Sequence, residues 1–400
     1  MIILIFILYF LSFLIIWQFV GYPTLMAVIA RRNNAKPKDY SYQPFVSILV
    51  PTYNEENVIG NRIENLNHLD YADDNYEIIV VDSGSNDYTQ DIVRKKIKEN
   101  TGKPELKLVI EKERRGKASA INYGKKHAKG DIILVTDANS IFEKDVLKEM
   151  MPHFSNPKIG AVGGKYTLPN SDTLITSSNQ FYLDIEYIMR KGESILDSAC
   201  LFHGEINAWR KNIVNADVGI VSEDLDMAIQ IRKKKYKVEY EPKAVNYEPA
   251  PTSIEEQIIQ RKRNSIGTIK NIFKHIDYWL PPKDIYSLLI FPSHKGLVMF
   301  SPFILFAVPI LYFLIRDLQI IVIHFILVLI SFTLLFLILN HLKSKIIKTN
   351  NLKSGFSFKS LPKIIFYVLL NEYIVLLAWK DFIFGKYSVL WDKVESTREL

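Results

Sequence analysis

Two short runs of aliphatic residues, each followed by a polar segment, constrain the fold of this chain most strongly. Ile78–Val81 and Ile132–Val135 are apolar at every position, which is typical of strands that are covered on both faces. Strands of this kind belong to parallel sheets with helices packed on each side. We therefore expect a doubly wound α/β domain with a mostly parallel sheet.

The spacing of the other apolar residues adds two more strands and two helices. Four apolar residues recur at helical spacing between the first two strands, and Ala118–His127 is predicted to be helical between the last two. The predicted strands are Val46–Val50, Glu77–Val81, Leu106–Ile110 and Ile132–Val135, and the four helical residues are Val58, Ile63, Leu66 and Leu69.

Polar segments follow three of the predicted strands. They are Pro51–Glu56, Asp82–Asp87 and Thr136–Ser140. Each alone is typical of an ordinary turn. In a doubly wound sheet, however, ligands bind at the carboxyl ends of the strands, so three such segments on one rim indicate a binding site.

Both ends of the chain are apolar. Met1–Ala30 carries no charge and is long enough to cross the roughly 30 Å hydrocarbon core as a helix. It lacks a basic leader and a clear small-residue cleavage site, which favours an uncleaved anchor over a signal peptide. Basic residues follow it and, by the positive-inside rule, place the next region in the cytoplasm; they are Arg31, Arg32, Lys36 and Lys38.

The C-terminal half contains further membrane candidates. Leu297–Ile315 and Leu318–Leu339 are predicted to form a hairpin of two spans, and Leu361–Trp379 either spans or lies in the interface, because Asn371 and Glu372 sit at its centre. An amphipathic helix before them suits either the membrane interface or the surface of a folded core. Its apolar residues are Ile266, Ile269, Phe273, Ile276 and Leu280.

Composition narrows the function classes. The formal charge is +7, but many of the basic residues flank apolar segments, which favours a membrane surface over a nucleic-acid stripe with interleaved aromatics. The single cysteine, Cys200, excludes an internal disulfide framework.

One compact acidic cluster, Val221–Asp226, lies between the predicted α/β region and the basic, increasingly apolar C-terminal half of the chain. On its own it is typical of a helix start, because Ser222 is a good N-cap residue and carboxylates in the first turn complement the helix dipole.

Six motifs give the chain a family resemblance. It resembles the family 2 inverting glycosyltransferases of the GT-A fold between Phe45 and Asn264. The flanking apolar segments and Trp391–Arg398 are also similar to the membrane-integrated chitin, hyaluronan, cellulose and poly-N-acetylglucosamine synthases. The motifs, in the family's order, are Pro51–Glu55, Val80–Asp87, Arg115–Asn122, Thr136–Asn139, Ser222–Asp224 and Gln260–Asn264.

The resemblance implies a multi-pass cell-membrane enzyme with a cytoplasmic catalytic domain. The expected division is an N-terminal transmembrane helix at 1–30, a GT-A domain at 45–250, interfacial helices at 251–294 and a C-terminal transmembrane region at 295–400.

The resemblance also implies a site for a nucleoside-diphosphate sugar, expected to be UDP-linked. Lys117 suits a phosphate as a point charge, although a solvated lysine on a basic loop is the alternative. The nucleotide pocket would use Pro51, Tyr53, Glu55 and Asp82, and the diphosphate would meet Gln260, Arg261 and Arg263.

A divalent metal, Mg²⁺ or Mn²⁺, is implied by the position of Asp137 and Asn139. These residues stand where the family has two aspartates around one residue. Asn139 offers only a neutral oxygen, so the metal would bind less tightly or depend more on Asp137 and on the diphosphate.

Asp224 matches the family's catalytic base, with Ser222 in place of a threonine. Glu223 and Asp226 would support it. We expect the pKa of Asp224 to be raised by the like charge of Glu223 and of bound phosphate, which is the direction that a general base needs.

Acceptor binding is assigned by resemblance to His203 and Gly204, and to Asn264. Processive relatives carry a tryptophan at the last of these positions, so Asn264 weakens the case for processive elongation. The first hypothesis is transfer to a growing or initiating surface polysaccharide, and the alternative is transfer of one sugar to a polyprenyl or dolichyl phosphate. A nucleotide-binding scaffold without catalysis is the third, which the intact Glu223, Asp224 and Arg263 oppose.

Overall fold

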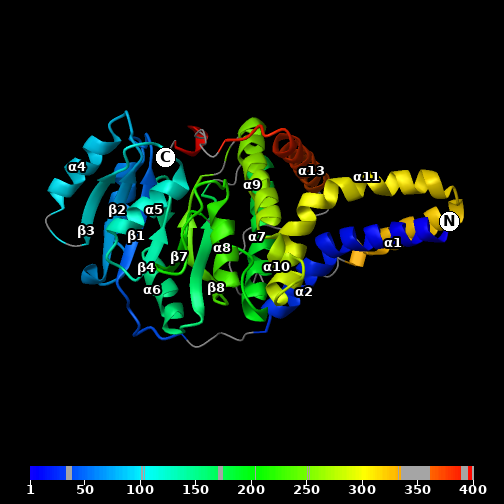
Figure 1. The fold of residues 1–400 in the computed structure, drawn as a ribbon, viewed down its shortest axis with the longest axis horizontal. Coiled ribbons are helices and arrows are strands. Elements are labelled where there is room, and N and C mark those ends of the chain that lie inside the picture. The colour runs from blue at the N-terminus through cyan, green and yellow to red at the C-terminus, as the bar shows by residue number, and fades with distance from the viewer. Residues whose placement is uncertain are drawn as a thin grey trace.

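The computed structural model describes residues 1–32, 38–100, 102, 104–169, 174–202, 204–249, 251, 253–331, 333–334, 361–388 and 395–398. An α/β region lies at one end, and two long helices project from the other (Figure 1). The N-terminus lies at the tip of the projecting helices, whereas the described C-terminal residues lie near the sheet.

The parallel half of the sheet matches the predicted strands. Four neighbouring strands run parallel in the order β3 (Glu105–Ile110), β2 (Tyr76–Asp82), β1 (Val46–Thr52) and β4 (Ile132–Val135). Apolar residues of α3 (Ile59–Asn67) and α4 (Thr89–Glu99) pack on one face, and those of α5 (Lys117–His127) pack on the other. This half is therefore covered on both faces, as the apolar runs predict.

The other half of the sheet corrects the prediction of a mostly parallel sheet. Its strands, in spatial order from β4, are β7 (Asn207–Arg210), β6 (Ile159–Thr167), β8 (Lys237–Tyr247) and β5 (Ile141–Phe142). β7 is antiparallel to both neighbours and β5 is antiparallel to β8, while β6 and β8 are parallel. The eight-stranded sheet is therefore mixed.

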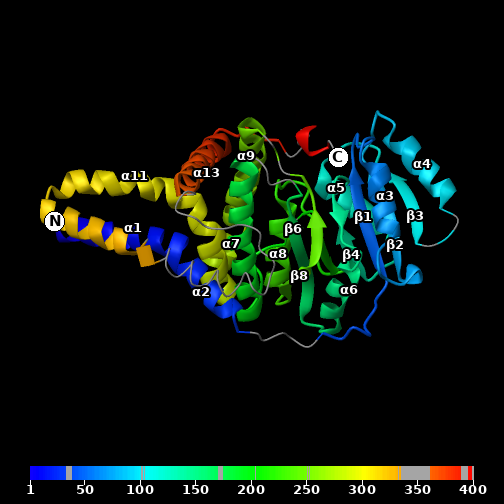
Figure 2. The ribbon, with the colours of Figure 1, turned by 180° about the vertical axis from the view of Figure 1, so that it is seen from behind.

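Helices stand between the sheet and the projecting pair (Figure 2). The apolar face of α9 is partly buried: Ile266 and Ile269 are inside, whereas Phe273 is exposed and stacks on Phe382. The helices of this layer are α7 (Leu174–Leu196), α8 (Glu223–Lys233), α9 (Ile254–Lys274), α10 (Ile276–Trp279) and α13 (Leu361–Ile383), and the short α6 (Val146–Met150) lies beside the sheet.

Two helices among the described residues are long and apolar enough to cross a membrane, by length and composition. Ile2–Ala30 comprises α1 (Ile2–Ile16), a π-helical turn η1 (Trp17–Gly21) and α2 (Tyr22–Ala30). Tyr286–Ile315 ends in α11 (Leu297–Ile315). A shorter apolar helix, Leu318–Ser331, follows, and the predicted span to Leu339 lies partly outside the described residues.

Close packing of two helices joins the N-terminal segment to the α/β region. At Gly192 of α7, an added Cβ would lie 2.9 Å from the backbone carbon and Cα of Met26 in α2. Real Cβ atoms do not approach backbone so closely, so the position requires glycine.

We expect Gly192→Ala to lower the free energy of unfolding by about 1–3 kcal/mol, because the added methyl must push α2 away from α7. Thermal unfolding in detergent measures this. Gly60→Ala is the matched control, because a Cβ at this helical glycine would meet only Ile92, at 3.6 Å, and alanine favours helix. Equal melting temperatures for the two variants would refute the packing argument.

Candidate active site

The polar ends of β1 and β2 form one wall of the site. Asp82 is buried and accepts hydrogen bonds from the backbone nitrogens of Gly84 and Ser85, at 3.1 and 3.0 Å, and from Gln90, at 2.7 Å. The guanidinium of Arg114 stacks on the ring of Tyr53, 3.9 Å from its centroid. Pro51 lies beside Val81 in the ladder, so the predicted nucleotide-pocket residues share one rim.

A segment from the far end of the sequence completes this wall. Arg398 forms an ion pair with Glu55, with 3.1 Å between its nitrogen and the carboxylate oxygen. The carbonyl of Thr397 accepts a hydrogen bond from the side chain of Asn139 at 3.3 Å. Thr397 and Arg398 end the Trp391–Arg398 motif that carries a family likeness, and the sequence alone does not predict that they contact Asn139 and Glu55.

Lys117 lies where the predicted phosphate site and the predicted base meet. It begins α5 directly after Gly116, whose φ of 93° favours glycine. Its ammonium lies 2.5 Å from a carboxylate oxygen of Asp137 and donates to the carbonyl of Gly204 at 3.2 Å. Burial lowers the pKa of Lys117, but the charges of Asp137 and Glu223 outweigh burial and raise it overall, so the group stays cationic.

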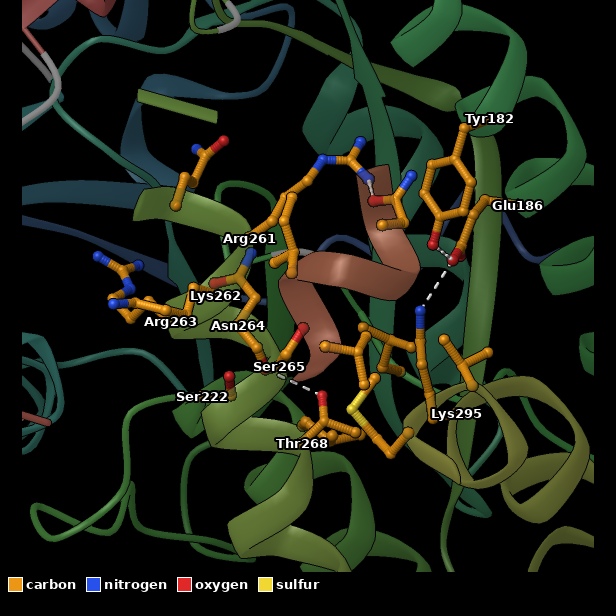
Figure 3. Close-up of a pocket in the computed structure, with 18 of the residues that line it drawn as sticks. Tyr182, Glu186, Ser222, Arg261, Lys262, Arg263, Asn264, Ser265, Thr268 and Lys295 are labelled. Atoms are coloured by element: carbon orange, nitrogen blue, oxygen red, sulfur yellow. Dashed lines mark hydrogen bonds and ion pairs between the residues drawn. The ribbon is translucent and has the colours of Figure 1, made fainter. Parts of the chain in front are cut away.

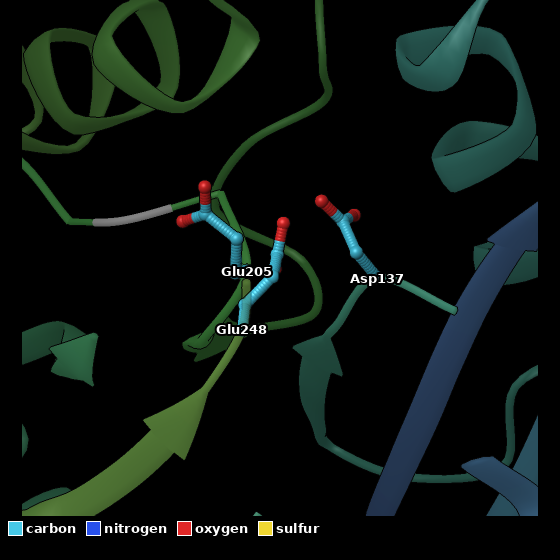
Figure 4. A group of neighbouring side chains, drawn as sticks. All are labelled: Asp137, Glu205 and Glu248. Atoms are coloured by element: carbon cyan, nitrogen blue, oxygen red, sulfur yellow. The ribbon is translucent and has the colours of Figure 1, made fainter. Parts of the chain in front are cut away.

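Three carboxylates, which we call the acid triad, face one another beside Lys117 (Figure 4). Asp137, Glu205 and Glu248 each place an oxygen within 4.8 Å of the others. Burial, with repulsion from Glu248 and Asp137, raises the pKa of Glu205 to about 8. Burial and Asp137 raise the pKa of Glu248 to about 7.

The acid triad fits a divalent cation. Carboxylate oxygens are the ligands that Mg²⁺ and Mn²⁺ prefer, and a cation would relieve the repulsion that raises these pKa values. Asp137 is the only member that the sequence analysis assigned to a metal.

Asn139, the second predicted ligand, lies beside the acid triad. Its side chain is buried, and its amide nitrogen donates to Glu248 at 3.2 Å. In this arrangement it positions a carboxylate, and its role as a ligand stays a prediction. Glu248 directly follows β8, just as Asp82 is the last residue of β2. The expectation that ligands bind at strand ends would therefore have pointed to Glu248 if β8 had been recognised in the sequence.

Glu223 and Asp224 open α8 and line the cavity described below. Burial raises the pKa of Asp224, against the opposing charges of Lys117, Arg190 and Arg263. Burial likewise raises the pKa of Glu223 to about 7. The pKa of Asp224 is thus raised, as predicted from the sequence, but the main cause is burial rather than the like charge of Glu223.

Asp226 and Ser222 both contact α9, and of the two only Ser222 also lines the cavity. Asp226 is buried, and one oxygen lies 2.7 Å from both Lys274 and His275. Ser222 precedes α8 but makes no capping hydrogen bond through its side chain. Asp226 therefore holds the start of α8 against the C-terminal end of α9.

Gly204 lies near both Lys117, the predicted phosphate-binding residue, and Asp224, the predicted base. A Cβ there would be 3.4 Å from the Lys117 ammonium and 3.8 Å from an Asp224 oxygen. His203, the other acceptor residue predicted in this segment, lies outside the described residues.

The predicted Gln260–Asn264 motif lies on α9 and lines the cavity (Figure 3). Arg261 turns toward α7 and α13, where it donates to Asn179 at 2.9 Å and also bonds Tyr367 and Asn371. Burial lowers the pKa of Arg263, while the nearby charges of Glu223, Asp137 and Asp224 oppose that shift. Arg263 is thus the arginine of the motif placed near the acidic groups.

Lys117, Glu223, Asp224, the acid triad and the Gln260–Asn264 motif open into one cavity of about 1140 Å³. The predicted nucleotide-pocket residues Pro51, Tyr53, Glu55 and Asp82 are not part of its lining. Its polar end holds Lys117, Glu223, Asp224, Arg263 and the acid triad. Its other end reaches apolar residues of the projecting helices, namely Ile15, Phe19, Val298, Met299 and Leu305. The arrangement can hold an anionic ligand beside a base and, further in, an amphipathic second ligand.

Two family models match the chain. Residues 47–214 match glycosyl transferase family 2, and residues 132–340 match glycosyl transferase family group 2. The second match alone covers more than half of the 400 residues.

Curated relatives share part of the sequence. The poly-beta-1,6-N-acetyl-D-glucosamine synthase of Staphylococcus aureus (strain MSSA476) is 28% identical over 229 residues, which cover 56% of this chain and 54% of that protein. The synthase of Staphylococcus epidermidis is 27% identical over 241 residues, 58% of this chain and 56% of that protein. The chain thus matches about half the length of these relatives.

A solved structure shares the fold over nearly the whole chain. The mannosyltransferase PcManGT from Pyrobaculum calidifontis, in complex with GDP-Man and Mn²⁺, superposes with a TM-score of 0.67. The alignment covers 95% of this chain and 100% of that one at 23% identity, which shows the GT-A type of fold.

The acid triad gives a prediction on metal affinity. We expect Glu248→Gln to weaken Mn²⁺ binding, measured by calorimetry with UDP present, by about tenfold or more, because affinity follows the number of charged ligands. Glu143→Gln, at an exposed carboxylate that accepts from Tyr247, is the control and should leave binding unchanged. Equal affinities in both variants would exclude Glu248 as a ligand.

Proposed function

Because the chain belongs to glycosyl transferase family 2, we propose that it is a membrane-bound inverting hexosyltransferase that uses a nucleoside-diphosphate sugar to grow or initiate a surface polysaccharide. The observation that carries the proposal is one cavity in which Lys117, Arg263 and the acid triad lie beside Asp224. A cationic and metal-binding rim suits a diphosphate, and a buried carboxylate suits an acceptor hydroxyl.

The donor is a nucleotide sugar that we expect to be UDP-linked. The Tyr53 ring and the Asp82 carboxylate would meet the base and ribose, and Lys117 the diphosphate. When bound at Asp137, Glu205 and Glu248, Mg²⁺ or Mn²⁺ would neutralise charge on the diphosphate. The GDP-Man and Mn²⁺ in the similarly folded mannosyltransferase support a nucleotide-sugar donor and a divalent metal, without favouring UDP.

The reaction is a single displacement. Asp224 accepts the proton of the acceptor hydroxyl, and the resulting oxygen attacks the anomeric carbon on the face opposite the diphosphate. The bond from that carbon to the diphosphate oxygen breaks, and its electron pair leaves with the diphosphate, which Lys117 and Arg263 stabilise. One displacement inverts the anomeric centre, and the raised pKa of Asp224 makes it a stronger base.

The proposed location is the cell membrane, with the catalytic domain in the cytoplasm and more than one spanning helix. Ile2–Ala30 and Tyr286–Ile315 support this by length and composition. Arg31 and Arg32 directly follow the first of them, which by the positive-inside rule places the domain on the cytoplasmic side.

Transfer of one sugar to a lipid acceptor is the second candidate. Asn264 lines the cavity, and it stands where processive relatives carry an aromatic platform. Mass analysis of the product separates the two candidates: a ladder of polymers supports elongation, and a single organic-soluble glycolipid supports one transfer.

We expect Asp224→Asn to reduce diphosphate release from UDP- and GDP-sugars by about 10²- to 10⁴-fold, because the general base is lost. Nucleotide binding, measured by calorimetry, should persist. Asp277→Asn is the control, since Asp277 is exposed and pairs with Lys233 on the surface. Turnover that survives in Asp224→Asn would show that another group removes the proton.

The pH dependence follows from the raised pKa of Asp224. The base acts only when deprotonated, so kcat/KM should fall as the pH drops through its pKa. Because that pKa is raised, the fall should begin above about 3.9, the ordinary value for aspartate. A pH profile of initial rates measures it, and a profile that stays flat down to pH 4 would contradict the assignment.

A further inference from the structure

A second charged cluster, distinct from the acid triad, lies along the cavity between α7 and the second apolar helix. It consists of Glu186, Arg190 and Glu193 on α7, with His294 and Lys295 within the second apolar helix, Tyr286–Ile315, and all of them but Glu193 line the cavity. Lys295 lies 2.8 Å from Glu186, and Arg190 donates to Glu186 at 3.2 Å. Figure 3 shows Glu186 and Lys295 across the cavity from Arg261–Asn264.

The basic groups outnumber the acidic ones within this cluster. The two ring nitrogens of His294 lie 2.6 Å from Glu193 and 3.0 Å from Glu186. Carboxylates only accept, so both nitrogens donate and the ring is cationic. Burial raises the pKa of Glu186, but Lys295, His294 and Arg190 lower it far more, so this carboxylate is ionised and the cluster carries a surplus positive charge.

Two buried polar atoms on the same wall have no hydrogen-bond partner among the described residues. They are Nη1 of Arg190 and Oε1 of Gln18, whose side chains are only 2% and 8% exposed. Both residues line the cavity. An unpaired buried donor is costly, so a cavity ligand with acceptor oxygens would satisfy Arg190.

The backbone around this wall is irregular. Gln18 belongs to the π-turn η1, and His294 and Lys295 belong to another, η5 (Pro292–Gly296). Trp17 donates to Ser293 at 2.9 Å, which joins the two turns. Turns of this kind often occur at functional sites.

The cavity also opens sideways onto an apolar surface. Three residues line the cavity and are themselves exposed: Ile259 of α9 by 57%, Leu305 of α11 by 38% and Leu369 of α13 by 61%. An opening bounded by exposed aliphatic side chains suits a hydrocarbon chain.

We propose that the cavity binds a lipid-linked acceptor, with its phosphate on Arg190 and Lys295 and its hydrocarbon chain in the opening between α9, α11 and α13. The planar fork of arginine and the point charge of lysine both suit phosphate oxygens. The inference rests on the proposed function, since it names the acceptor class of the same transfer. It favours a glycan carried on a lipid phosphate over a free soluble chain.

The test measures ligand binding without any donor. Native mass spectrometry of the full chain in detergent compares undecaprenyl phosphate with undecaprenol, inorganic phosphate and a soluble oligosaccharide. The wild-type protein should prefer undecaprenyl phosphate over undecaprenol at least tenfold, and millimolar inorganic phosphate should not displace it. Equal binding of the two lipids, displacement by inorganic phosphate, or preferred binding of the oligosaccharide would overturn the proposal.

Variants locate the site. Arg190→Gln and Lys295→Gln should each reduce the preference for the phosphorylated lipid at least tenfold, while Lys295→Arg retains it. Lys233→Gln is the matched control, because its ammonium pairs with the exposed Asp277 outside the cavity. Unchanged preference in Lys295→Gln would overturn the assignment, and this variant decides the outcome if the more buried Arg190→Gln does not fold.

Donor turnover is scored separately. Failure of the wild-type protein to release diphosphate from any nucleotide sugar would refute the proposed function, while the lipid comparison would still report on the phosphate site. Diphosphate release combined with equal binding of both lipids would refute only the lipid-phosphate inference.

Discussion

The contact between the start of α8 and the middle of α9 is the constraint on which the site depends. Gly267 packs so closely on Ser222 that a Cβ would lie 2.6 Å from the serine Cβ and 2.9 Å from its backbone nitrogen. Asn271 donates to the carbonyl of Ser222 at 3.2 Å, and Asp226 holds Lys274 and His275. Asp224 and Arg263 come from different helices, and these contacts fix their spacing. Pairing with Lys274 and His275 offsets the cost of burying the Asp226 carboxylate.

The sequence predicted the parallel half of the fold well and the mixed half poorly. β2 and β4 are buried along their whole length and carry unbroken apolar runs, and these runs made the parallel half recognisable. β7 and β5 have only four and two residues, and β7 lacks the unbroken aliphatic run that marks the equally short β4. β6 contains Gly163 and Gly164, which lack side chains because Phe202 and Ile206 pack against them, and glycine weakens a strand pattern.

The candidate site was predictable where a residue follows a recognised strand or lies in a family motif. Asp82, Asp137, Lys117 and Asp224 were found in this way. Glu248 was missed because β8 was not recognised. The charged cluster around Arg190 was missed because its carboxylates, Glu186 and Glu193, pair with His294, which is about a hundred positions away in sequence. Pairing across such distances leaves no local pattern, so only the folded arrangement brings these charges together.

The ion pair between Arg398 and Glu55 joins positions that lie 343 residues apart. A chain is synthesised from its N-terminus, and its domains generally fold as units in that order. The residues of the sheet and of both long apolar helices are therefore synthesised before residue 398. Thr397 and Arg398 are thus the last described residues of the cavity lining to be made, so a nascent chain that already carries both long apolar helices still lacks this side of the cavity.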